Sequence, residues 1–213
     1  MKTILVAGAN GKTGREVVDL LKGMPNYKPL AMIRNPEQQA RFDLMDVDTV
    51  IADLEGDLTQ ATQGVHAVIF AAGSGSQTPA HKTIEVDQNG AIKLIDQAKA
   101  NGVQKFIMLS SMGADDPDHA PAELNYYLKA KKTADDYLTA AFTNYSIVRP
   151  GALTQGAKTN KVSAAKKLNQ KGKISRKDVA QVLVDSLTHE HTRNKTFEVL
   201  NGKIEIPIAL SAL

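Results

Sequence analysis

Apolar positions along the chain gather into short runs separated by longer stretches with helical periodicity. The short runs are apolar on both faces and end at Gly, Pro, Asn or Asp, a pattern typical of buried parallel strands. They predict strands at 3–7, 29–33, 49–52, 67–71, 105–109 and 145–148. The other stretches predict helices at about 12–23, 36–44, 79–101, 122–142 and 175–189. Strands that alternate with helices in this way indicate βαβ units, right-handed crossovers and a parallel sheet.

Helix start and stop signals support several of these limits. They are C-cap glycines at 23 and 102, Asn-Pro at 35–36 and Thr-Pro at 78–79 as helix starts, and a capping box of Ser175 and Asp178. The sequence contains no internal repeat, low-complexity segment or linker. We therefore expect one α/β domain, 1–213, whose least regular stretch, 151–174, is a loop or hairpin after the sixth strand.

Composition narrows the class of protein without identifying it. Apolar residues make up 42% and charged residues 23% of the chain, as in an ordinary globular protein. The absence of cysteine excludes disulfides, thiolate metal sites and cysteine nucleophiles. No apolar run approaches the roughly 18 residues of a membrane span, and the apolar run at 4–7 is too short for a signal peptide. We therefore expect a cytoplasmic protein with no membrane partner.

Positive charge is concentrated in one stretch, 156–177. It contains eight cations and no acid: Lys158, Lys161, Lys166, Lys167, Lys171, Lys173, Arg176 and Lys177. Two interpretations stay open, a solvated surface ribbon and an anion-attracting rim beside a ligand site. A nucleic-acid partner is not expected, because the stretch has no aromatic residue on which bases could stack.

A glycine-rich loop, 8–14, follows the first predicted strand and opens the first helix. Glycines let the backbone approach a pyrophosphate closely, and the helix N-terminus offers free N–H groups and partial positive charge. The loop therefore predicts a dinucleotide site that includes Gly8, Asn10, Gly11, Lys12, Thr13 and Gly14. A nucleoside-triphosphate P-loop is disfavoured, because Val6 stands where that motif needs a glycine. The plain alternative is a glycine-rich connection without a ligand.

The residue about 20 positions beyond this loop indicates which dinucleotide would bind. An acid there would bind the ribose hydroxyls of NAD, but the second strand ends in Arg34 and Asn35. A guanidinium can bind a 2′-phosphate through two parallel hydrogen bonds, and Lys12 could add a second cation. The sequence therefore favours NADP(H), with NAD(H) as the alternative. Arg34 could also be no more than an exposed cation at the end of a strand.

Taken together, the motifs of the chain resemble those of the atypical branch of the short-chain dehydrogenase/reductase superfamily. Within that branch they are most similar to the compact NmrA-like NAD(P)H-binding proteins, which are often labelled epimerase/dehydratase or NADH-flavin reductase. The motifs that carry the resemblance lie at 8–14, 33–36, 52–54, 70–73, 109–111, 148–151 and 174–180. The resemblance implies a doubly wound parallel Rossmann sheet ordered 3-2-1-4-5-6-7. It also implies that Asp53 and Leu54 lie along adenine, Ala71, Ala72 and Gly73 beneath the adenine-side ribose, and Pro150 and Gly151 near nicotinamide.

The same resemblance implies a reaction centre of a serine with Tyr-x-x-x-Lys. Here that motif is Tyr127 and Lys131, with Ser111 as the serine and Ser110 in reserve. Spacing of i, i+4 puts Tyr127 and Lys131 on one helix face, where an ammonium would favour the phenolate and could hold the nicotinamide ribose. The alternative is an ordinary helix face with solvated lysines. Asp87 stands where the family often has an Asn that braces the lysine.

Two other clusters have plainer interpretations. His189 and His191, at i, i+2, lie on different sides of a helix, so we expect a solvated helix end and no metal site. The stretch 115–119 reads as a polar loop near the substrate side, with His119 as a minor candidate for proton transfer.

Three functions are compatible with these patterns. The first is an NAD(P)H-dependent oxidoreductase, NADP(H) preferred, that transfers a hydride to a small carbonyl, quinone or flavin-like acceptor. The second is an NADPH-binding redox sensor, which alone among the three would need a protein partner. The third is a nucleotide-sugar epimerase or dehydratase, disfavoured because few residues follow Pro150 to build a separate substrate lobe.

Overall fold

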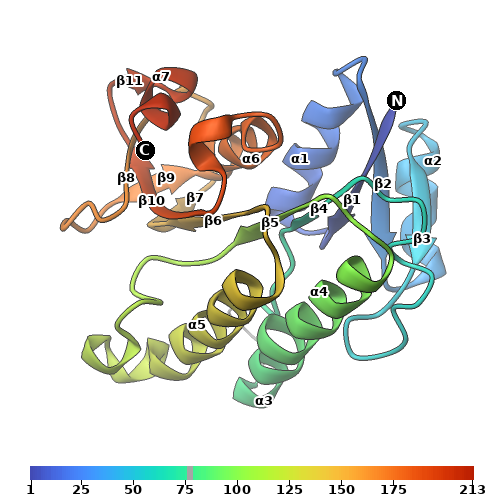
Figure 1. Ribbon diagram of the computed structural model, residues 1–213, viewed down its shortest axis with the longest axis horizontal. Helices are drawn as coiled ribbons and strands as arrows, with labels where there is room; N and C mark the ends of the chain where they lie inside the picture. Colours follow the sequence, from blue (N-terminus) through green and yellow to red (C-terminus); the bar gives the residue numbers. More distant parts are fainter. Residues whose placement is uncertain (76–78) are drawn as a thin grey trace.

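A mostly parallel sheet runs through the centre of the protein (Figure 1). The computed structural model describes residues 1–75 and 79–213, and in this part of the chain the main sheet has the order β11-β8-β10-β6-β5-β4-β1-β2-β3. The strands are β1 (Lys2–Ala7), β2 (Tyr27–Ile33), β3 (Asp48–Ile51), β4 (Ala67–Phe70), β5 (Lys105–Leu109), β6 (Tyr145–Pro150), β8 (Lys161–Ala165), β10 (Lys195–Asn201) and β11 (Ile204–Glu205). From β3 to β10 all neighbours are parallel, so the predicted 3-2-1-4-5-6-7 order is confirmed with β10 in seventh place.

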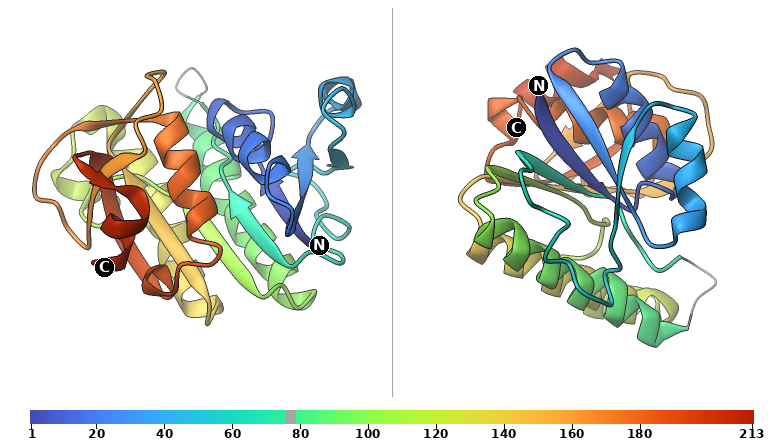
Figure 2. Two further views of the ribbon diagram at one scale, coloured as in Figure 1. Left: turned by 90° about the horizontal axis from the view of Figure 1, so that it is seen from above. Right: turned by 90° about the vertical axis from the view of Figure 1, so that its right-hand side faces the viewer.

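Helices cover both faces of this sheet (Figure 2). On one face α1 (Lys12–Lys22) packs against α6 (Arg176–Asp185), and on the other α4 (Ala91–Ala100) packs against α5 (Ala122–Ala141). The remaining helical elements are η1 (Pro36–Gln38), α2 (Gln39–Asp43), α3 (Ala80–Thr83), the π-helical turn η2 (Ile84–Gly90), η3 (Pro117–His119), η4 (Glu190–Thr192) and α7 (Ile206–Ser211). The doubly wound α/β fold is thus confirmed.

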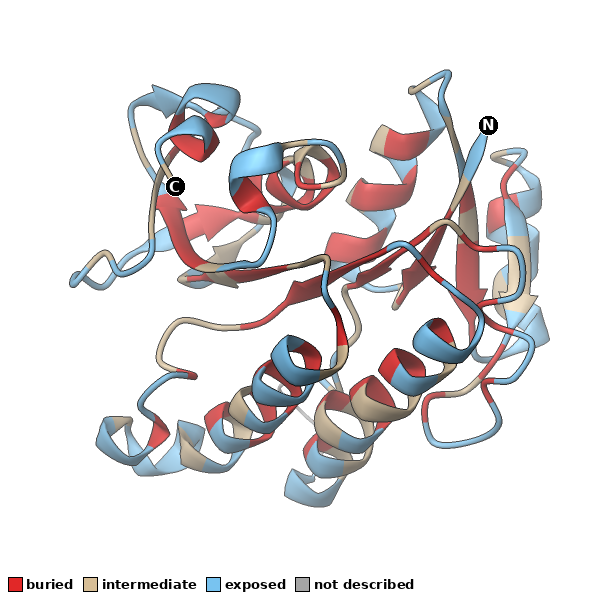
Figure 3. Cartoon of the chain, viewed as in Figure 1, coloured by how far each residue is buried: buried red, intermediate tan, exposed pale blue. Residues whose placement is uncertain are grey.

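The core consists of two apolar layers, one on each face of the sheet (Figure 3). Successive residues of a strand point to opposite faces, so a strand that is apolar throughout supplies both layers. In β1, Ile4 and Val6 join the layer under α1 and α6, whereas Leu5 and Ala7 join the layer under α4 and α5. All four side chains are fully buried. Continuous apolar runs therefore gave a reliable prediction of the parallel strands.

The stretch 151–174 differs from its prediction as a loop or hairpin. It contains β8, which pairs antiparallel with β10, and β7 (Ala152–Thr154), which pairs in parallel with β9 (Lys173–Ser175) in a second small sheet. The local pattern did not indicate these strands because they are only three to five residues long and β8 has only one fully buried side chain, Val162. Pairing with β10 outweighs this weak local β pattern.

Two predicted helices also change their limits. The stretch 79–101 is helical but not uniform, because η2 separates α3 from α4; Thr78 lies outside the described residues. The helix expected at 175–189 ends at Asp185, and His189 precedes the separate turn η4. At the start of α6 the Ser175 hydroxyl accepts the Asp178 N–H at 3.0 Å, which confirms Ser175 as the N-cap, while the Asp178 carboxylate accepts the Ser175 hydroxyl at 2.7 Å. Among the helices described, none is long and apolar enough to cross a bilayer.

Candidate active site

The glycine loop 8–14 lies tightly against the end of β4. Gly8 has a φ of +81°, and a Cβ there would lie 2.6 Å from the Ala72 backbone. A Cβ on Gly14 would lie 2.1 Å from the Gly8 carbonyl oxygen, which also accepts the Gly11 N–H at 2.9 Å. Glycine is therefore required at positions 8 and 14 by close packing, and at 8 also by backbone conformation.

The same loop leaves the N-terminus of α1 open to an anion. Gly11 is the N-cap residue, no side chain caps the helix, and its first turn contains no acid. The first N–H groups of a helix have no intrahelical acceptor, and the helix dipole adds partial positive charge there. Lys12 is exposed beside them, and the amide oxygen of Asn10 is held by Arg15 at 2.8 Å. This arrangement suits a phosphate group.

A cavity of about 470 Å³ opens in front of the loop, at the carboxyl ends of the parallel strands. Eight of the predicted cofactor residues line it: Gly8, Asn10, Gly11, Arg34, Asp53, Leu54, Ala72 and Gly73. Four others from the same motifs are not part of its lining: Lys12, Thr13, Gly14 and Ala71. Its other wall residues were not predicted: Met32, Gln38, Ala52, Glu55, Ser74, Pro79, Lys82 and Val86. We refer to it as the strand-end cavity.

Arg34 stands at this cavity with an uncommitted side chain. Its backbone N–H donates to Gln38 Oε1 at 3.1 Å, but within residues 1–75 and 79–213 its guanidinium makes no hydrogen bond or ion pair. The side chain is exposed. A free guanidinium beside an open helix N-terminus, in a cavity of this size, is consistent with a dinucleotide that carries an additional phosphate.

Lys131, on α5, is buried against the end of β5 and forms an ion pair with Asp87. The two side chains are 3% and 1% exposed, and Lys131 Nζ lies 2.9 Å from Asp87 Oδ1 and 3.4 Å from the Leu109 carbonyl oxygen. Burial disfavours the ammonium, but the nearby Asp87 carboxylate outweighs it and holds the pKa of Lys131 above its ordinary value. Lys131 is thus a permanent cation at neutral pH.

Asp87 also connects Lys131 to the wall of the strand-end cavity. Its second oxygen, Oδ2, accepts the Ser74 N–H at 2.9 Å, and Ser74 lines the cavity. A Cβ on Gly73 would lie 3.2 Å from Asp87 Oδ1, so the backbone passes close to this carboxylate. Asp87 lies in the π-helical turn η2, a local geometry often found at functional sites. One carboxylate therefore fixes the cavity wall and the buried lysine together.

Tyr127 lies next to Lys131, as their spacing predicts. Lys131 Nζ is 5.7 Å from the centre of the half-buried Tyr127 ring and 5.9 Å from that of Phe70. In the part of the chain that the structure describes, no group hydrogen-bonds the Tyr127 hydroxyl. The hydroxyl is therefore available to a ligand.

The two neighbouring serines differ in their contacts. Ser110 is 3% exposed and donates to Asp135 Oδ2 at 2.7 Å, so its hydroxyl is committed to the interior. Ser111 is half-buried, and its hydroxyl donates a 3.3 Å hydrogen bond to the Met112 carbonyl oxygen. This difference favours Ser111 as the residue that could meet a substrate, with Ser110 as part of the supporting structure.

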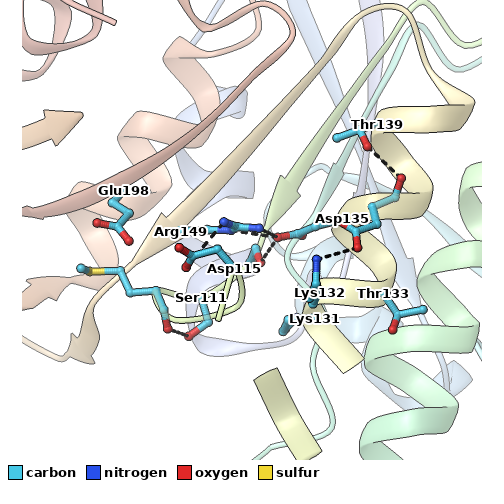
Figure 4. Close-up of polar contacts among 12 residues, drawn as sticks. Ser111, Asp115, Lys131, Lys132, Thr133, Asp135, Thr139, Arg149 and Glu198 are labelled. Carbon is cyan, nitrogen blue, oxygen red and sulfur yellow. Dashed lines mark hydrogen bonds and ion pairs between the residues drawn. The ribbon is translucent and has the colours of Figure 1, made fainter. Parts of the chain in front are cut away.

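Beyond Ser110, an ionic network continues through Asp135, Arg149 and Asp115, which lie side by side in Figure 4. Arg149 lies between Asp135, at 2.9 Å, and Asp115, at 3.8 Å. Burial raises the pKa of Asp135 above its ordinary value, although Arg149 and Ser110 oppose this. Lys167 then joins Asp115, at 2.5 Å, to Glu198, at 3.4 Å. Lys167, one lysine of the basic stretch 156–177, therefore forms ion pairs with two acidic side chains. The stretch is thus not solvated along its whole length.

The remaining predicted residues serve packing or lie apart. Gly151 follows β6, where a Cβ would lie 2.4 Å from Leu200 Cδ2 and 2.5 Å from the Gly172 oxygen, and Pro150 ends the strand. His119 is exposed and paired with Asp116 at 2.8 Å. Among the described residues, no group of three or more histidines, aspartates and glutamates is placed to hold a metal ion.

These features define a Rossmann-type dinucleotide-binding protein. Residues 8–190 match the NAD(P)H-binding family, and the chain belongs to that family. It is 39% identical over 216 residues to an uncharacterized sugar epimerase, YhfK, of Bacillus subtilis, with all of both chains covered. A putative NAD-dependent epimerase/dehydratase from Bacillus halodurans is 42% identical, with a TM-score of 0.95 over all of both chains. The oxidoreductase ylbE from Lactococcus lactis is 28% identical, with a TM-score of 0.87 over 99% of this chain and 96% of its own.

The resemblance inferred from the motifs is thereby confirmed. The structural neighbours are epimerase/dehydratase-like and NADH-flavin reductase-like proteins, which is the NmrA-like branch. Several relatives and neighbours are themselves named reductases or oxidoreductases.

Proposed function

We propose that this chain is an NADP(H)-preferring oxidoreductase that reduces a small carbonyl, quinone or flavin-like acceptor. One observation carries the proposal: a permanently charged, buried lysine lies beside an uncommitted tyrosine hydroxyl, at the same strand ends as the glycine loop and its cavity. Reductase names among the relatives support the same reaction class.

The residues present fit a nicotinamide dinucleotide. Gly8 and Gly14 bring bare backbone against the end of β4, and the uncapped N-terminus of α1 offers N–H groups to the diphosphate. Arg34 and Lys12 would hold the 2′-phosphate, and the strand-end cavity would take the adenosine half. When bound, the reduced cofactor supplies a hydride to the acceptor.

The side chains near β5 would manage the proton that accompanies this hydride. In our proposal Tyr127 donates its hydroxyl proton to the acceptor oxygen, and Ser111 orients that oxygen by a hydrogen bond. Lys131 stabilises the resulting phenolate by its charge and holds the nicotinamide ribose. Pro150 and Gly151, at the end of β6, would border the nicotinamide. Asp87 positions Lys131 through the 2.9 Å ion pair.

The epimerase names of some relatives raise a competing reaction class, in which the cofactor is recycled rather than consumed. Residues 151–213 do not form a separate substrate lobe: β8, β10 and β11 join the main sheet, β7 and β9 pair in the small sheet, and α6 packs against α1. Steady consumption of NADPH with an acceptor panel is expected. Binding without consumption would instead support a nucleotide sensor, and turnover of a sugar nucleotide without net oxidation would support an epimerase.

The cofactor preference is tested by Arg34→Ala. We expect this variant to bind NADPH about 10- to 100-fold more weakly and NADH within about twofold of the wild type, because only NADPH loses a charged hydrogen-bond partner. Fluorescence titration of both nucleotides measures the effect. Arg41→Ala is the matched control, since Arg41 is an exposed cation on α2 that does not line the strand-end cavity. Equal losses for the two nucleotides would remove Arg34 from phosphate recognition.

A further inference from the structure

An ion pair joins two residues that line the strand-end cavity. Lys82 Nζ lies 2.6 Å from Glu55 Oε2, and both residues line the cavity. Glu55 belongs to the segment after β3 and Lys82 to α3, so the pair joins two elements that are 27 positions apart in sequence. The two side chains are 38% and 28% exposed, so the pair is partly open to solvent.

Lys82 has a second acidic partner that lies outside the cavity lining. Its Nζ is 2.9 Å from Glu85 Oε2, one helical turn away. Hydrogen bonds to Glu55 and then Glu85 raise the pKa of Lys82 to about 12, so this side chain is charged under all ordinary conditions. The two ion pairs of Lys82 therefore differ in their acidic partner: Glu55 lines the cavity, whereas Glu85 is not part of its lining.

The lining residues of the cavity suit a flat heteroaromatic base, because they combine apolar side chains with carboxylates. The apolar side chains are Met32, Ala52, Leu54, Pro79 and Val86. The carboxylates of Asp53 and Glu55 belong to the same lining. Asp53 Oδ1 already accepts the Glu55 N–H at 3.0 Å and Glu55 Oε2 accepts from Lys82, so Glu55 Oε1 and Asp53 Oδ2 are the carboxylate oxygens left for a ligand.

We propose that the Glu55–Lys82 pair is a clamp that closes over the base of the dinucleotide and selects a base with an exocyclic amine. Carboxylate oxygens accept hydrogen bonds from the amino group of adenine, whereas they repel the carbonyl oxygen that hypoxanthine carries in its place. This inference rests on the placement of the dinucleotide proposed above. It makes Glu55 and Lys82 specificity-determining residues of the cofactor site, outside the glycine loop and the Arg34 position.

The clamp is tested by nucleotide binding and release, independent of turnover. Dissociation rates and Kd for NADPH, and for its hypoxanthine analogue, are measured by NADPH fluorescence on the wild type, Glu55→Gln, Lys82→Met and the control Glu85→Gln. Both clamp variants are expected to release NADPH about fivefold faster, the range of a half-exposed ion pair, and Glu85→Gln to remain within about twofold. The wild type should bind the hypoxanthine analogue about tenfold more weakly than NADPH, and Glu55→Gln should reduce this difference.

Two results would overturn the clamp. One is an NADPH release rate that is unchanged in both clamp variants or equally raised in Glu85→Gln. The other is equal affinity of the wild type for the two nucleotides. If Arg34→Ala weakens NADPH binding while the clamp variants do not, only the clamp fails. If none of these variants alters binding, the placement of the dinucleotide fails as well. Unfolding curves of the three variants, whose side chains are partly exposed, check that each is folded.

Discussion

Replacement of Tyr127 by phenylalanine is expected to lower kcat by about 10²- to 10⁴-fold, the usual contribution of a positioned general acid. The substitution removes the hydroxyl and keeps the ring that lies 5.7 Å from the Lys131 ammonium. NADPH affinity should stay within about twofold, because the proton is needed only when the acceptor is reduced. Steady-state oxidation of NADPH with a competent acceptor, together with a fluorescence titration, separates the two effects.

Tyr126→Phe is the matched control for this variant. Tyr126 is the preceding residue on α5, is 40% exposed, and does not approach Lys131 in any described contact. It should retain the wild-type kcat. Unchanged turnover in Tyr127→Phe would remove this tyrosine from the mechanism and leave an acceptor that takes its proton from water. A loss shared equally by both variants would point to a packing defect of α5.

Much of the fold could be predicted because its parallel strands are locally conspicuous. The run Ile4–Leu5–Val6–Ala7 is apolar on both faces, and only a strand covered on both sides by helices buries all four side chains. The run Lys161–Val162–Ser163 in β8 has no such signal, and its place in the sheet depends on pairing with β10. The turn η2 was also unpredictable, because a π-helical turn within a helix has no simple residue pattern.

The candidate site likewise contains parts that a short sequence motif predicts and parts that depend on contacts between residues far apart in the sequence. The glycine loop and the Tyr127–Lys131 spacing are short motifs whose geometry follows from one turn or one helix. The Lys82–Glu55 pair and the Ser110–Asp135 hydrogen bond join residues 27 and 25 positions apart, and only the assembled sheet brings them together. The family resemblance implied that Asp87 stands near Lys131, but the direct ion pair follows only from the assembled fold.

That ion pair leads to the largest expected effect on stability. Lys131→Met and Asp87→Asn should each destabilise the protein by about 3–5 kcal/mol, because each leaves an uncompensated charge in a site where the partners are 3% and 1% exposed. The double variant should cost much less than the sum of the two, since both charges are then absent. Urea unfolding measures all three. The exposed pair Lys132–Asp136, at 2.8 Å, is the matched control, and its removal should cost at most about 1 kcal/mol.

The pH dependence of Asp87→Asn distinguishes a lost charge pair from lost packing. In the wild type Asp87 raises the pKa of Lys131 above its unfolded value, so this stabilisation is complete at neutral pH and is lost only as pH rises beyond the ordinary lysine range. Without the carboxylate, burial is the largest remaining influence on Lys131. It lowers the pKa of Lys131 in the folded state against the opposing effects of Tyr127 and Asp135, and we expect the unfolded chain then to bind the additional proton. The stability of Asp87→Asn should therefore rise with pH toward the ordinary lysine value, relative to Asp136→Asn. A parallel pH profile for these two variants would mean that the Lys131 charge does not depend on Asp87.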